Sequence, residues 1–512
     1  MSKLENEALE SPDEMKIYDY NRDPMRNKHG LSYLGKLPYR KSVDIKKSIV
    51  GIGMETLDRD TFDPNDIYGF LADSGVKWAR CQTGWLKCEK EKGVYDFAWL
   101  ENIVESLLHI GIQPWFSVSF GNPLYTPVEE YDNYAVKHPG ERPPGRIRGY
   151  VGEVPLYHGA EAVKGWHNYL VALANRFKGR VSHWEIWNEP DHLGMFWLHK
   201  GQKLYPEIKD DSQRRRRCSK DYAEFVKISS SAIKSVIPAA KIIGIATDIE
   251  YLRGLRENNI AEHIDVFAYH YYGFTPEYYA REKFDLVKTI IGKPGKKIDF
   301  WMGESGKHTG KPQYPSYFPT EYNQAKFLTR RFVTDLNCGV GLSSYFTASD
   351  LSNYYPDGSD QHYGIINRKE KRPKLSFSAL QSIAWIFDGI EKAEDLFIGF
   401  TPVHDAQFSS SLIYHLATGA FRRKGIPVFS AYLPENVDIS ATPVTGELLL
   451  SIEMNDQLNH PIIIDPIRRN VYEIKHISKP QWAAGSYVIN PLTFVDYPMF
   501  ITDISVLDDK RE

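Results

Sequence analysis

The stretch VSHWEIWNE, residues 181–189, decides the fold of this chain. Its branched and aromatic residues favour a β-strand, and Pro190 directly after it favours an end to that strand. A helical pattern of apolar residues precedes the stretch at 164–179, and another follows it at 222–236. Strands alternating with helices build parallel sheets, so we expect this stretch to belong to one βα unit of an α/β fold.

Seven further strand candidates extend the alternation in both directions, with amphipathic helical patterns between them and a last helix at 374–390. Eight strands and eight helices predict a closed (β/α)₈ TIM barrel. An open doubly wound sheet is the structural alternative, but the glycine-rich phosphate turn that such sheets commonly carry is absent after the first strand. The further candidates lie at 48–54, 76–80, 113–120, 241–247, 264–271, 297–305 and 341–349.

After Ile390 the pattern changes to short alternating runs separated by turn residues, which is typical of an antiparallel β-sandwich. We therefore expect a catalytic barrel over 48–390 and an accessory sandwich domain over 391–512. Residues 1–47 form an N-terminal arm without a clear element of its own. Such an arm could contribute a strand to the sandwich.

Composition and charge exclude several classes of partner. A net charge of -3 provides no field that would attract nucleic acid or an acidic membrane. No window approaches the roughly 20 apolar residues of a membrane helix. The polar, acidic start differs from a signal peptide, so we expect a cytoplasmic protein, or a secreted or periplasmic one if the chain is a mature form. The sequence allows a homo-oligomer but does not predict one.

Two glutamates close predicted strands: Glu189 ends the fourth and Glu304 ends the seventh. Barrel enzymes carry their catalytic groups at the carboxyl ends of strands, so these side chains should meet at the barrel mouth. Retaining cleavage of a glycosidic bond needs two carboxyl groups about 5 to 5.5 Å apart, one protonated and one ionised. The pair predicts a retaining glycoside hydrolase that needs neither cofactor nor metal and acts on an oligo- or polysaccharide. A solvated or capping role is the alternative for either glutamate alone.

Around these residues the sequence resembles a known group of enzymes. Trp187-Asn188-Glu189-Pro190 resembles the Asn-Glu-Pro motif of clan A glycoside hydrolases, and the context of Glu304 resembles their nucleophile strand. Family 39, which contains β-xylosidases and α-L-iduronidases, is the most similar family. The resemblance implies that Glu189 is the general acid/base and Glu304 the nucleophile, and that β-xylosides are the first substrates to consider.

The same resemblance implies roles for three neighbours. His270 and Tyr272 are similar to the clan's His-x-Tyr arrangement, in which the tyrosine holds the nucleophile. Arg80 is similar to the arginine that keeps the nucleophile charged. A core histidine and a buried structural ion pair are the alternatives for His270 and Arg80. Glu185 is expected deeper in the barrel as a partner for a cation.

Further candidates come from the residue types alone. Asn188 is suited to bind the sugar 2-hydroxyl, provided that the strand ends or bulges before it, because neighbouring strand residues otherwise face opposite ways. The rings of Trp85, Trp187 and Trp301 are expected to wall the sugar pocket, although large cores also use such rings.

The run Arg214–Arg217 lies in the insertion after the fourth strand. A solvated charged loop is one interpretation, and attraction of an anionic sugar is the other. Long insertions at 121–160 and 190–220 favour exo action. The alternatives are hydrolysis of an acidic glycan (an iduronide, uronide or sulfated sugar), endo action on a polysaccharide, and a catalytically inactive sugar-binding barrel. A metal-dependent hydrolase is disfavoured because only His270 and Asp350 offer themselves as ligands at strand ends.

Overall fold

The computed structural model describes most of the chain, including all eight strands of the barrel. The first 22 residues of the N-terminal arm and parts of the insertions and the C-terminal domain lie outside the described residues. No described helix combines the length and apolar character needed to cross a membrane. The described ranges are 23–139, 145–273, 275–310, 319–355, 357–402, 416–434, 445–453, 458–479 and 486–508.

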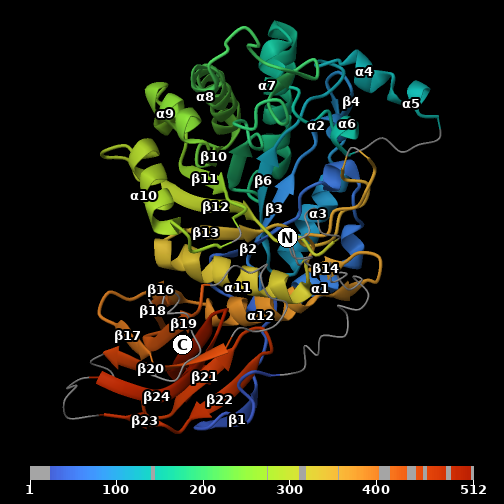
Figure 1. Cartoon of the computed structure of the whole chain (residues 1–512). Helices are drawn as coiled ribbons and strands as arrows, with labels where there is room; N and C mark the ends of the chain where they lie inside the picture. Colours follow the sequence, from blue (N-terminus) through green and yellow to red (C-terminus); the bar gives the residue numbers. More distant parts are fainter. Residues whose placement is uncertain are drawn as a thin grey trace, which may run out of the picture.

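The eight predicted strands close into one parallel barrel in chain order, which confirms the expected (β/α)₈ architecture (Figure 1). The observed strands are a few residues shorter than the sequence pattern at several ends. The fourth and the eighth differ most, and the fourth ends at Ile186, which leaves Glu189 in the following loop. The barrel strands are β2 (Val50–Gly53), β3 (Trp78–Gln82), β6 (Gln113–Val118), β7 (His183–Ile186), β10 (Lys241–Ile245), β11 (Val266–His270), β12 (Asp299–Ser305) and β13 (Leu342–Tyr345).

A helix follows each barrel strand and covers the outside of the barrel (Figure 1). In α3 the buried side chains Leu100, Ile103, Val104 and Leu107 recur at steps of three and four residues, so one face of the helix packs inward. The eight helices are α1 (Tyr68–Ala72), α3 (Ala98–His109), α7 (Ala160–Phe177), α8 (Asp211–Val236), α9 (Ile249–Glu257), α10 (Ala280–Ile291), α11 (Glu321–Cys338) and α12 (Leu375–Ile386).

Short elements decorate the connections between strands and helices. The insertions after β6 and β7 carry several of them, as expected for long loops at one end of the barrel. They are α2 (Trp85–Cys88), α4 (Glu129–Asp132), α5 (Tyr134–Lys137), α6 (Gly145–Arg148), β4 (Glu89–Glu91), β5 (Val94–Tyr95), β8 (Leu198–His199), β9 (Gln202–Lys203), β14 (Ile366–Asn367) and β15 (Arg372–Pro373). The 3₁₀ turns are η2 (Ser42–Asp44), η3 (Leu57–Arg59), η4 (Pro64–Asp66), η5 (Pro155–Tyr157), η6 (Ile260–Glu262) and η7 (Ile504–Leu507).

The C-terminal region forms two antiparallel sheets, in agreement with the expected β-sandwich (Figure 1). One sheet has seven strands and includes β1 (Leu31–Lys36) from the N-terminal arm, which pairs antiparallel with β22. Its other members are β16 (Ile390–Lys392), β18 (Ala417–Arg423), β19 (Ile426–Tyr432), β21 (Pro461–Asp465), β22 (Asn470–Ile474) and β25 (Met499–Asp503). The second sheet holds β17 (Phe397–Pro402), β20 (Thr445–Glu453), β23 (Ile477–Ser478) and β24 (Ser486–Val495).

Helices α11 and α12 lie between the barrel and the sandwich (Figure 1). Lys326 of α11 forms an ion pair of 2.6 Å with Asp496, which follows β24, and both side chains are at most 1% exposed. On α12, the Trp385 ring lies 4.0 Å from the guanidinium carbon of Arg423 in β18. Buried charged contacts therefore join the accessory domain to the barrel.

We expect Asp496→Ala to lower the free energy of unfolding by about 3–5 kcal/mol, because it leaves the Lys326 ammonium buried without its carboxylate. Urea unfolding followed by circular dichroism measures this change. The control is Glu161→Ala at the exposed pair Lys92–Glu161, where the side chains are 49% and 74% exposed. The control should unfold at nearly the wild-type urea concentration. Equal effects of the two variants would show that the buried pair does not hold the domains together.

Candidate active site

Glu189 reaches the barrel mouth because its strand ends early. Strand β7 stops at Ile186, and Trp187 and Glu189 then adopt φ angles of 70° and 44°. Non-glycine residues rarely adopt such angles, which cost free energy and concentrate at functional sites. The turn lets Asn188 and Glu189 both line the same pocket, which a regular strand would not allow.

Glu304 lies within β12, beside His270 of β11 in the barrel register. Two donors hold its carboxylate. Tyr272 donates its hydroxyl to Oε1, and Nη1 of Arg80 donates to Oε2 at 2.8 Å. Both donors are residues that the sequence singled out for this contact, and the charged bond from Arg80 is of the stronger kind.

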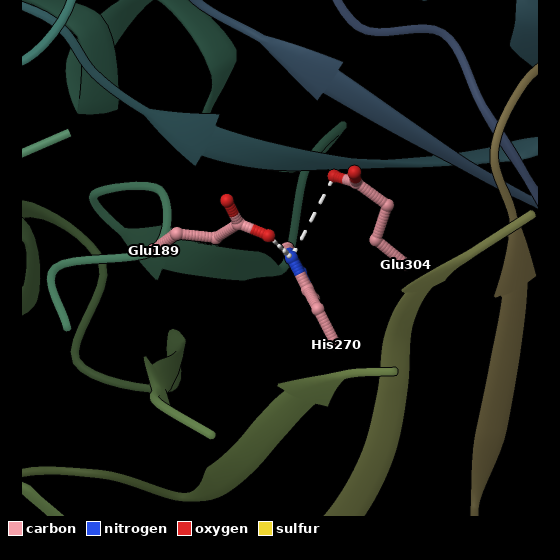
Figure 2. Close-up of side chains that lie close together, drawn as sticks. All are labelled: Glu189, His270 and Glu304. Carbon is pink, nitrogen blue, oxygen red and sulfur yellow. Dashed lines mark hydrogen bonds and ion pairs between the residues drawn. The ribbon is translucent and has the colours of Figure 1, made fainter. Parts of the chain in front are cut away.

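His270 lies between the two glutamates, and the three side chains point toward one another (Figure 2). Its Nδ1 is 2.8 Å from Oε1 of Glu189 and 3.7 Å from Oε2 of Glu304. One ligand atom from each of the three residues lies within 4.8 Å of the others. The two carboxyl groups therefore approach closely across the barrel mouth.

Burial shifts the pKa values of Glu189 and His270 in opposite directions. Burial raises the pKa of Glu189 above 4.5, and the nearby His192 and Arg80 only partly oppose it. Burial lowers the pKa of His270 to about 4, even though Glu304 acts in the opposite direction. His270 is therefore neutral near pH 7, and Glu189 keeps its proton to a higher pH than an exposed glutamate does.

Arg80 is the central cation of the site and is fully buried. Its Nη2 donates to Glu185 and, at 2.9 Å, to Oδ1 of Asn188, while Nη1 is shared between Glu304 and Glu55. Burial opposes the charge on Arg80, but Glu185, Glu55 and Glu304 raise its pKa. The contact with Glu185 agrees with the expected structural role of that glutamate.

A pocket of about 260 Å³ opens above these residues. Asn188, Glu189, Tyr272 and Glu304 line it, as the sequence suggested. Other lining residues were missed by the sequence reasoning. Glu55 and Gln82 come at or just after the ends of β2 and β3, a position that could have identified them, and three tyrosines come from the loop after β13. The missed residues include Glu55, Arg59, Gln82, Tyr354, Tyr355 and Tyr363.

The three tryptophans are corrections to the sequence analysis, because none lines this pocket. Trp85 and Trp187 have no exposed surface, and Trp187 donates its Nε1 hydrogen to the carbonyl of Phe196 at 2.6 Å. Trp301 packs inside the barrel, with its ring centroid 5.4 Å from that of Trp115. These rings belong to the core.

The arginine run is also corrected. Arg214–Arg217 lie in the first turns of α8, whose N-cap Asp210 accepts a hydrogen bond from the backbone of Gln213. Every guanidinium of the run has a carboxylate partner, and none lines the pocket. The charges are therefore balanced locally. The partners include Asp211, Asp248, Glu250, Glu257 and Asp221.

No family model matches the chain, and no curated protein matches it. Solved structures share its fold. A family 39 glycoside hydrolase from the gut symbiont Bacteroides cellulosilyticus WH2 has a TM-score of 0.60 at 15% identity, covering 91% of this chain and 83% of that chain. A GH30 endoxylanase from Clostridium papyrosolvens C71 has a TM-score of 0.50 at 11% identity, covering 91% of this chain and 99% of that chain. The chain therefore has the fold of known glycoside hydrolases, including one from the family that its motifs resemble.

Within the described residues, Glu189, His270 and Glu304 are the group whose geometry could hold a metal ion. The neighbouring charge disfavours this use. The guanidinium of Arg80 lies 2.8 Å from Glu304, and Tyr272 already donates to the other oxygen of that carboxylate. A divalent ion would have to approach against a fixed positive charge.

We expect zinc chloride titrated into the protein near pH 7 to give no saturable one-to-one binding heat that depends on His270. Isothermal titration calorimetry of the wild type and of His270→Ala makes the comparison. Weak binding elsewhere on the surface would be the same in both proteins. A stoichiometric heat in the wild type that disappears in the variant would instead identify a metal centre.

Proposed function

We propose that the protein is a retaining O-glycosidase that uses Glu304 as nucleophile and Glu189 as general acid/base. The close approach of the two carboxyl groups is the observation that carries the proposal, since one oxygen of each lies within 4.8 Å of the other. Retaining enzymes place these groups about 5 to 5.5 Å apart, whereas inverting enzymes need roughly 6.5–9.5 Å to admit a water molecule.

In the first step, Glu304 attacks the anomeric carbon, and the bond from that carbon to the leaving oxygen breaks. Glu189 gives its proton to the leaving oxygen, for which the raised pKa of its buried carboxyl group prepares it. The Oε1 atom of Glu189 faces Nδ1 of His270, so the Oε2 atom is the one that delivers the proton. Asn188 is held by Arg80 through Oδ1, which leaves its amide hydrogens for the sugar 2-hydroxyl.

In the second step, water attacks the anomeric carbon of the glycosyl-enzyme. Glu189, now ionised, takes a proton from this water, and Glu304 leaves as a carboxylate. Arg80 and Tyr272 donate hydrogen bonds to the negative charge that returns to Glu304. Both residues thus support the resting state and the departure of the nucleophile.

We infer exo action on a β-xyloside as the first specificity to test. A pocket of about 260 Å³ is small compared with ordinary ligand sites of roughly 300–1,000 Å³, which favours a single sugar ring over a polysaccharide chain. An acidic glycan and endo action are alternative substrates and modes. A sugar-binding barrel without turnover is the alternative of another class, and the two carboxyl groups with their donors argue against it.

Glu304→Ala should lower kcat/KM for aryl glycosides by up to an order of 10⁶-fold, the size of loss seen when a hydrolase loses its nucleophile. Added azide should restore turnover and give a glycosyl azide of inverted anomeric configuration, because azide then attacks the anomeric carbon directly. Glu189→Ala should instead give the azide of retained configuration through the glycosyl-enzyme. Product configuration by nuclear magnetic resonance distinguishes the two. Full activity of the Glu304 variant without azide would remove the nucleophile assignment.

The pH dependence of kcat/KM should have an alkaline limb set by Glu189. Turnover needs the protonated carboxyl group, so a pKa raised above 4.5 extends activity to higher pH, and activity falls as the pH passes through that pKa. Glu189→Gln should remove this limb and lower kcat/KM about 10²–10⁴-fold for poor leaving groups. A dinitrophenyl glycoside, which needs little protonation, is the control substrate and should lose much less. A variant that keeps both the limb and the wild-type kcat/KM for poor leaving groups would contradict the acid role.

A further inference from the structure

Glu55 brings an additional carboxyl group to the same pocket. It lies two residues after the end of β2, and only 1% of its surface is exposed. Its Oε1 accepts a hydrogen bond of 3.1 Å from Nη1 of Arg80. The same nitrogen donates to Oε2 of Glu304 at 2.8 Å, so a single guanidinium nitrogen is shared between Glu55 and the proposed nucleophile.

The charges around Arg80 do not balance if every carboxyl group is ionised. Glu55, Glu185 and Glu304 would bring three negative charges to one guanidinium in a buried region. Carboxylates this close in a medium of low dielectric constant do not all ionise at neutral pH. At least one of the three must keep its proton.

Glu55 has a weaker set of donors than Glu304. Glu304 receives hydrogen bonds from Arg80 and Tyr272, whereas Glu55 shares the Arg80 nitrogen. Its Oε2 has a long contact of 3.5 Å with Oγ1 of Thr347, and that hydroxyl already donates to the carbonyl of Gly53 at 2.8 Å. Burial raises the pKa of Glu55 to about 8, against the pull of Arg80 and with the help of the negative charge on Glu304.

Position distinguishes Glu55 from Glu185. Glu185 is buried beneath the site and does not line the pocket, while Glu55 does so together with Gln82 and Thr56. A protonated carboxyl group is a hydrogen-bond donor, and sugar hydroxyl oxygens are acceptors. Glu55 thus lines the same pocket that a ring held between Glu189 and Glu304 would occupy.

We propose that Glu55 is a third functional carboxyl group of this pocket, which stays protonated beside the ionised Glu304 and donates a hydrogen bond to a sugar hydroxyl. The proposal rests on the glycosidase function proposed above. Among the described residues, the titratable or charged groups that act on Glu55 are Arg80, Glu304 and the thiol of Cys81. Burial raises the pKa of that thiol, so it stays neutral. Ionisation of Glu55 would remove the donor and place a second negative charge beside the nucleophile.

The test is the pH dependence of kcat/KM for a dinitrophenyl glycoside, whose leaving group removes the need for the acid Glu189. The wild type should lose activity about tenfold per pH unit above about pH 8, where Glu55 ionises. Glu55→Gln keeps a neutral donor and should stay active beyond that pH. Glu55→Ala has no donor and should lose about tenfold or more at every pH, as expected for one hydrogen bond. Glu185→Gln is the matched comparison: it removes one negative charge from Arg80, so the alkaline limb should persist in this variant but move to lower pH.

An alkaline limb that persists in Glu55→Gln, or one that disappears in Glu185→Gln instead, would overturn the proposal. Thermal unfolding of each variant shows whether it has folded. Infrared difference spectra of the protein between about pH 6 and pH 9 separate this proposal from the function. A protonated carboxyl band that titrates in the wild type and is missing in Glu55→Gln would establish the proton on Glu55 even if no glycoside were cleaved. In that case the protonated state of Glu55 would stand, and only its proposed hydrogen bond to a sugar hydroxyl would be disproved together with the glycosidase function.

Discussion

The site depends on one buried cation. An uncompensated guanidinium in the barrel interior would cost several kcal/mol, so the acids around Arg80 are required by its presence. These partners come from parts of the chain that only barrel closure brings together: Glu55 after β2, Glu185 on β7 and Glu304 on β12. Arg80 also holds Asn188. The same interaction therefore joins the strands and fixes the groups that face the pocket.

The four glutamates of the site differ in burial and in hydrogen-bond donors, and these surroundings give their carboxyl groups different roles. Glu189 is buried next to a neutral histidine, and its pKa rises. Glu304 has two strong donors, and Glu185 is confined below the pocket by the other guanidinium nitrogen. Glu55 shares its donor and is buried, so its pKa rises to about 8. The division of roles comes from hydrogen-bond supply and burial, because the carboxyl groups are chemically identical.

The sequence was sufficient to predict the barrel and to predict that Glu189 and Glu304 lie close together at its mouth, because both predictions follow strict patterns. A strand–helix alternation repeated eight times allows few topologies, and Glu189 and Glu304 stand at or near the ends of two predicted strands beside polar or glycine residues. It was insufficient where the same residue type serves two purposes. A tryptophan ring packs in a core as well as it stacks on a sugar, so the core position of Trp187 became evident only from its neighbours. Asp210 is a residue type that favours a helix N-cap, so the sequence did indicate that a helix begins just before Arg214. The run of arginines favoured a charged loop instead, and the helix start was missed.

The residues that line the pocket come from two sources, the ends of the barrel strands and the loops that follow them. The strand ends supply residues such as Glu304 and Gln82, whose positions follow from the barrel itself. The loops supply others, including Met195 after β7 and Tyr354 after β13. Loops vary without disturbing the barrel, so a structure can share the fold at 15% identity while its loop walls differ. The barrel thus positions the strand-end residues of the pocket, whereas the shape of the pocket wall depends on how the loop aromatic rings are placed.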